Sequence, residues 1–89
     1  MISEEIYNST LTLVREIISA ETGNEFDEIL PEMHLEDELE ITEVDLARLI
    51  KAINTHFNIN LDATEIEEEE SVETVKELAA VVAEEVELG

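Results

Sequence analysis

The chain has 89 residues, which is enough for one small domain, residues 1–89, but not for two. Its 25 acidic residues outnumber four basic ones, giving a formal net charge of −21. Because phosphate contacts depend on Lys and Arg, this balance argues against a free-standing nucleic-acid-binding protein and disfavours binding to an anionic membrane. Since the chain has no Cys, disulfides, thiolate zinc sites and cysteine nucleophiles are also excluded.

The apolar residues indicate a folded, soluble protein. They make up 44% of the chain and recur mostly at helical spacing, so the high charge does not signal disorder. No apolar run approaches the roughly 20 residues of a membrane span, and the segment Met1–Glu5 lacks the basic start of a signal peptide. We therefore expect an all-helical, cytoplasmic protein, and its charge favours a monomer.

The first predicted helix covers residues 3–21. Ser3 is suited to cap its start, with Glu4 and Glu5 in the first turn, and Gly23-Asn24 is suited to a left-handed end. The apolar residues at helical spacing are Ile6, Leu13, Val14, Ile17 and Ile18, with Tyr7 and Leu11 beside them.

A long connection follows over residues 23–41. Long connections are usually functional or packed by their own side chains. We expect its apolar residues to lie as anchors across the helix ends, and Leu30-Pro31 to be extended or turn-like. These residues are Phe26, Ile29, Leu30, Met33, Leu35 and Leu39.

Two capping-box patterns mark the later helices. Thr42 and Asp45 predict a helix over residues 43–57, and Thr64 with Glu67 predicts a short one. A last apolar stripe predicts a helix over residues 72–87. The expected fold is a small antiparallel bundle of three main helices plus one short helix.

This arrangement resembles the acyl carrier protein family over nearly the whole chain. The most specific stretch is Leu35–Leu61, with Glu36-Asp37-Glu38-Leu39 before the second helix and Phe57-x-Ile59-x-Leu61 after it. The resemblance implies partners in acyl or lipid metabolism, such as fatty-acid or polyketide synthesis. It also implies a Ser at the start of the second helix, whose hydroxyl carries a phosphopantetheine arm.

At that start the chain departs from the family pattern. The family usually reads Asp-Ser-Leu, whereas this chain has Thr42-Glu43-Val44, so Glu43 occupies the attachment position. A carboxylate cannot be the acceptor, and we therefore expect no cofactor. Glu43 itself is either a fixed charge that mimics the phosphate of a modified Ser or an acid favoured at a helix N-terminus. The second reading is the simpler one.

The second helix also departs in charge. The family's helix is acidic and docks on basic partners, whereas here Glu43 and Asp45 are balanced by Arg48 and Lys51. We therefore regard Asp45, Arg48 and Lys51 as partner-binding candidates. Either this helix meets a partner of mixed charge, or basic partners meet a different face of the protein.

Other interpretations stay open. The chain could be a genuine carrier loaded at Thr42, a variant of a Ser-bearing parent, or an acidic, cation-responsive module unrelated to acyl transfer. The aliphatic stripes could line an acyl pocket or form a closed core. His34 and His56 have no ligand spacing, and the run Glu67–Glu70 lacks the pattern of a calcium loop, so no metal site is predicted. Nor does any catalytic constellation indicate an enzyme.

Overall fold

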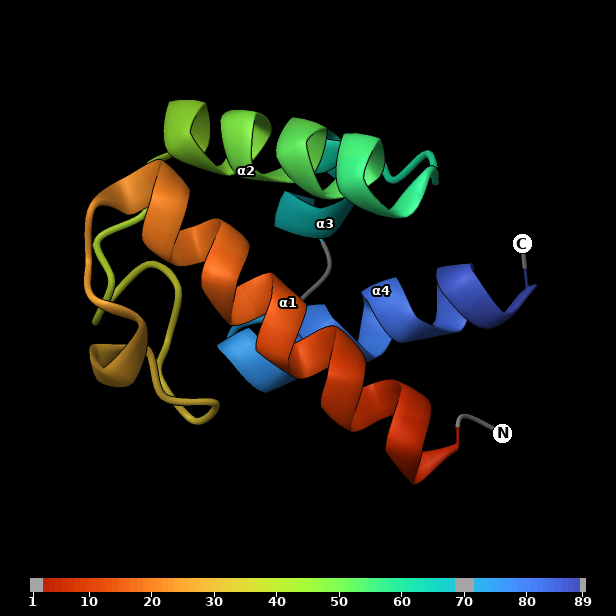
Figure 1. Ribbon diagram of the computed structural model, residues 1–89. Helices are drawn as coiled ribbons and strands as arrows, with labels where there is room; N and C mark the ends of the chain where they lie inside the picture. The colour runs from red at the N-terminus through yellow and green to blue at the C-terminus, as the bar shows by residue number, and fades with distance from the viewer. Residues whose placement is uncertain (1–2, 69–71, 89) are drawn as a thin grey trace.

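The computed structural model describes residues 3–68 and 72–88. In chain order its elements are α1 (Glu4–Thr22), the short 3₁₀ turn η1 (Phe26–Glu28), α2 (Glu43–Phe57), α3 (Ala63–Glu68) and α4 (Val75–Leu88). Helix α1 packs against both α2 and α4 and runs antiparallel to them (Figure 1). The predicted bundle of three main helices and one short helix is therefore confirmed. No helix in the described ranges is long and apolar enough to cross a membrane.

Helix α1 has the ends that the sequence predicts. The Ser3 hydroxyl accepts a hydrogen bond from the Ile6 N–H at 3.1 Å. At the other end Gly23 is left-handed, with φ of 81°, and its N–H donates to the Ser19 carbonyl at 2.9 Å. Such a conformation disfavours residues with a Cβ, so the glycine fixes where the helix ends.

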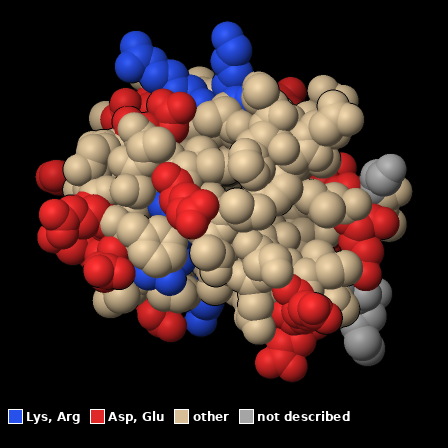
Figure 2. Space-filling view, viewed as in Figure 1, with Lys and Arg blue, Asp and Glu red and all other residues tan. Residues whose placement is uncertain are grey.

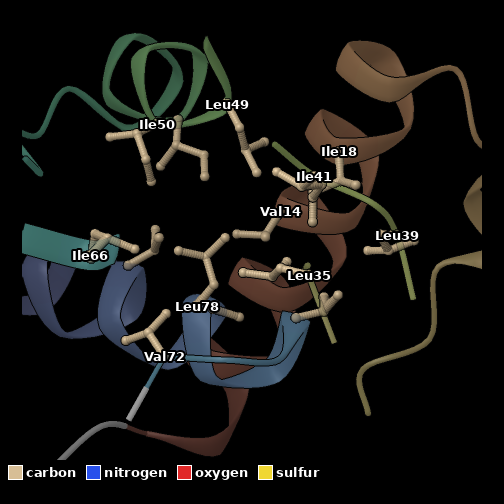
Figure 3. Close-up of a cluster of buried hydrophobic side chains, with 14 of the residues drawn as sticks. Val14, Ile18, Leu35, Leu39, Ile41, Leu49, Ile50, Ile66, Val72 and Leu78 are labelled. Carbon is tan, nitrogen blue, oxygen red and sulfur yellow. The ribbon is translucent and has the colours of Figure 1, made fainter. Parts of the chain in front are cut away.

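The core lies between the three long helices and is closed on one side by loop residues (Figure 3). Val14 and Ile18 of α1 are fully buried, whereas Ile6, at the start of the same apolar stripe, is 37% exposed. The other fully buried large side chains are Ile29, Leu49, Ile50, Ile53, Val75, Leu78 and Val82.

The connection after α1 is packed by its own side chains, as predicted. Ile29, Leu35 and Leu39 are buried, although Leu30 is 50% exposed and is not an anchor. Arg15 holds η1, which the sequence did not predict, against α1. Its guanidinium donates to the carbonyl oxygens of Ile29 and Phe26 and lies 4.1 Å from the centre of the Phe26 ring. The connection is therefore fixed to the bundle.

Helix α4 begins at Val75 and not at residue 72 as predicted. The preceding residues are extended because they pair with the connection: Leu35 N–H donates to the Glu73 carbonyl at 2.9 Å, and Val75 N–H donates to the Met33 carbonyl at 3.0 Å. An isolated antiparallel bridge joins His34 to Thr74. This pairing uses backbone groups that a longer helix would need.

The start of α3 is also corrected. The carboxylate of Asp62, not the hydroxyl of Thr64, caps this helix: it accepts the N–H groups of Thr64 at 2.8 Å and Glu65 at 3.4 Å. Thr64 lies inside the helix. Asp and Thr are both favourable capping residues, and here the helix starts after Asp62, so that residue is the cap.

Candidate functional site

The start of α2 is a closed capping box. The Thr42 hydroxyl accepts the Asp45 N–H at 3.2 Å, and the Thr42 N–H donates to the Asp45 carboxylate at 3.4 Å. The predicted roles of both residues in the cap are therefore confirmed. The Thr42 hydroxyl is engaged in holding the helix start, which is worth about 1 kcal/mol in typical proteins.

Glu43 is the first residue of α2 and is exposed. A negative charge there is stabilised by the helix dipole by about 0.3–1 kcal/mol. Val44, the next residue, is 63% exposed although it is large and apolar. The helix therefore begins with a carboxylate beside an exposed apolar side chain.

A strained turn leads into this site. Glu40 has a φ of 54°, a left-handed conformation that costs a residue with a Cβ about 1–2 kcal/mol. Its neighbours Leu39 and Ile41 are buried, at 8% and 6% exposure, and the Ile41 N–H donates to the Leu35 carbonyl at 2.9 Å. Burial of these two side chains offsets the strain and fixes the path of the chain into α2.

A cleft of about 510 Å³ lies beside Glu43, between the start of α2, helix α3 and the segments around residues 34–37 and 72–73. Its apolar wall is formed by Leu35, Ile41, Leu46, Ile66 and Val72. Its polar lining is formed by His34, Glu36, Asp37, Thr42, Glu43, Glu67 and Glu73. The aliphatic side chains therefore close the core and also wall a separate, acid-rimmed cleft at the helix start.

Helix α3 places the carboxylate of Glu67 close to that of Glu43 at this cleft. The pKa of Glu67 is raised above its ordinary value, first by partial desolvation, then by the negative charge of Glu43 and a hydrogen bond between the two side chains. Sequence reasoning does not find this pair, because in the sequence Glu67 fits a capping box with Thr64 and the acidic run Glu67–Glu70. The carboxylates of Glu43 and Glu67 therefore lie close enough to repel each other across the cleft.

The remaining partner-binding candidates lie further along α2. Arg48 and Lys51 are exposed and line a second, shallow groove between α1 and α2. Asp45 is held in the cap and does not line that groove. The structure therefore brings two of the three candidates into one groove, and the third lies in the turn before them.

The described residues contain no group of three or more side chains suited to hold a metal ion. Of the acidic run considered for cations, Glu69 and Glu70 lie outside the described residues. His34 lines the cleft and His56 lines the groove on α2, so the two imidazoles belong to different surfaces.

Comparison with known proteins agrees with this architecture. No curated protein matches the chain significantly. The sequence model of the family described as the phosphopantetheine attachment site matches residues 12–82, a range that runs from α1 to α4 and includes the whole of α2 and the cleft. The chain belongs to this family of phosphopantetheine carrier domains.

Proposed function

We propose that this chain, as one domain over residues 1–89, is a carrier-fold interaction protein of acyl or lipid metabolism that bears no arm at position 43. It is not an enzyme and works as a cytoplasmic monomer. The observation that carries the proposal is Glu43, an exposed carboxylate at the first position of α2. In the family that position holds the Ser on which the arm is loaded.

The residues at the start of α2 do not fit the family's cofactor. Attachment needs a free hydroxyl, and Glu43 has none. Thr42 supplies the nearest one, but it precedes the helix and its oxygen accepts the Asp45 N–H at 3.2 Å. Loading Thr42 would therefore compete with the cap that forms the helix start.

The exposed face of α2 supports a role in protein binding. Val44, Arg48 and Lys51 are exposed and spaced by four and three residues, so they lie on one side of the helix. Asp45 borders this face at its first turn. The family's interaction helix is thus retained here with a mixed, not an acidic, surface.

Intact mass after co-expression with a broad-specificity phosphopantetheinyl transferase tests the loss of attachment. We expect the wild-type chain to stay unmodified and the Glu43→Ser variant to gain one phosphopantetheine. A modified wild-type chain would overturn the proposal, and a Thr42→Val variant would then show whether Thr42 is the acceptor. Failure of both proteins to be modified would contradict the assignment of position 43 as the attachment position.

The interaction role needs a separate measurement. Purified carrier-dependent enzymes of fatty-acid and polyketide synthesis are passed over the immobilised chain, with an ordinary acyl carrier protein in a parallel channel. We expect at least one enzyme to bind both proteins. Binding to the ordinary carrier alone, for every enzyme tested, would contradict this role.

A further inference from the structure

We propose that the groove between α1 and α2 is the docking site for an acidic amphipathic helix of a partner protein. The inference rests on the proposed interaction role and specifies the chemistry of the partner. It concerns a surface distinct from the cleft at Glu43, since no residue lines both.

The floor of the groove is apolar. The groove has a volume of about 570 Å³. Ile17 and Ala20 on α1 and Ala52 on α2 form its apolar lining. Leu13, which is partly exposed, lies four residues before Ile17 and therefore continues the same side of α1 by one turn. The floor thus offers an apolar strip along α1 that suits the apolar stripe of a third helix.

The rim of the groove concentrates the chain's scarce positive charge. Arg48 and Lys51 line it, with Glu21 as its one acidic lining residue among those described. Of the two other basic residues, Arg15 is bound to η1 and Lys76 lies on α4. Half of the four basic residues therefore border one groove. Figure 2 shows basic side chains projecting at the edge formed by α2, with acidic side chains beside them and at the other edges.

The apolar floor and the basic rim together indicate which kind of helix the groove binds. An apolar strip with a basic rim is complementary to a helix whose apolar stripe is flanked by carboxylates. The long-range repulsion expected from a charge of −21 decays over about 8 Å at physiological ionic strength, so the local charges of the groove decide the contact. A second copy of this chain is a poorer occupant, because a symmetric contact through the same groove would bring the basic rims of the two copies together.

The probe is a synthetic amphipathic helical peptide of about 18 residues, with a Leu/Ala stripe flanked by two Glu. A matched peptide carries Gln in place of both Glu. Each is titrated into the ¹⁵N-labelled full chain, and amide shifts are followed by NMR. We expect saturable shifts at Ile17, Ala20 and Ala52 with the Glu peptide, and binding weakened about fivefold with the Gln peptide.

The chain supplies a matched pair of control variants. Lys51→Glu and Lys76→Glu change the net charge equally, but only Lys51 lines the groove. We expect Lys51→Glu to weaken Glu-peptide binding about fivefold and Lys76→Glu to change it less than about twofold. Equal losses in both variants, or shifts spread evenly over all surfaces, would overturn the proposal.

Two further outcomes would also overturn it. Sedimentation that shows concentration-dependent dimers, lost in Lys51→Glu, would assign the groove to a second copy of the chain. An absence of saturable shifts with either peptide would remove the groove as a docking site. The latter result would leave the proposed function standing if the carrier-dependent enzymes still bind, so the two proposals can fail independently.

Discussion

Helices α2 and α4 begin with the same local motif, a Thr followed three residues later by an acid, yet the two ends are built differently. At α2 the Thr42 hydroxyl accepts the Asp45 N–H and the Asp45 carboxylate accepts the Thr42 N–H, at an exposed corner. At α4 Thr74 is only 9% exposed, and Glu77 accepts hydrogen bonds from the N–H groups of Glu73 and Thr74 and from the Thr74 hydroxyl. The same motif therefore leaves an exposed helix start at α2, whereas at α4 it lies in the contact between two segments of the chain.

The pKa values of the carboxyl groups near the two helix starts also differ. The pKa of Glu77 is lowered, first by the Glu73 N–H and then by the Thr74 hydroxyl. The pKa of Glu67, which faces the start of α2, is raised. The α4 end is thus arranged around a charged carboxylate, whereas the α2 end brings two carboxylates together against their repulsion.

Removing the cap hydroxyls should give the largest difference between the ends. We expect Thr74→Ala to lower the free energy of unfolding by about 2 kcal/mol and Thr42→Ala by about 1 kcal/mol, because only Thr74 is buried and paired with a second segment. Urea unfolding followed by circular dichroism measures both. Thr74→Ser should restore most of the loss, and equal losses in the two Ala variants would contradict the distinction.

A smaller effect is expected from the strained turn before α2. Glu40→Gly should stabilise the chain by about 0.5 kcal/mol, because relief of the left-handed strain exceeds the entropic cost of glycine. That gain corresponds to a Tm rise of about 2–4 °C. Glu40→Gln removes the same charge without relieving the strain, so a matching rise in that variant would show that charge alone is responsible.

Acidification should distinguish the ends without any substitution. A raised pKa makes the charge on Glu67 unfavourable above that pKa, and this cost disappears as the pH falls below the ordinary value of 4.5. Glu77 behaves oppositely: its contribution is present above 4.5 and is lost as the pH falls through its lowered pKa. Side-chain carboxyl ¹³C shifts should therefore report Glu67 titrating first.

Glu43→Gln sharpens the same measurement. Removing the charge at position 43 should move the Glu67 pKa back toward its ordinary value and leave that of Glu77 unchanged. If Glu67 keeps its raised pKa in this variant, desolvation and the charges of Glu36 and Glu68 account for the shift, and Glu43 does not contribute to it.

The fold was predictable wherever the signal is local. Ser3, Gly23 and the Thr42 box act within one helical turn, so α1 and α2 were found within one residue of their predicted bounds. The start of α4 was missed because Val72 and Val75 are three residues apart and continue the helical stripe, although Val72 is buried in an extended segment. The pairing that keeps this segment extended joins distant parts of the chain, which periodicity does not reveal.

The candidate site was predictable only in part, for the same reason. Glu43 could be assigned from its place in the aligned motif. The opposition of Glu67 to Glu43 depends on how α3 lies across the start of α2, and the pairing of Arg48 and Lys51 with Ile17 depends on how α1 packs against α2. Such juxtapositions of separate elements have no local sequence signal.

The bridge between His34 and Thr74 also bears on how the protein folds. Most contacts in a helical bundle are local in sequence, and such proteins fold quickly. This bridge joins residues 34 and 74 and closes a loop that contains α2 and α3, so forming it carries the entropic cost of closing a long loop. We therefore expect the docking of α4 and the ordering of the connection after α1 to be coupled, so hydrogen exchange should protect the two segments together.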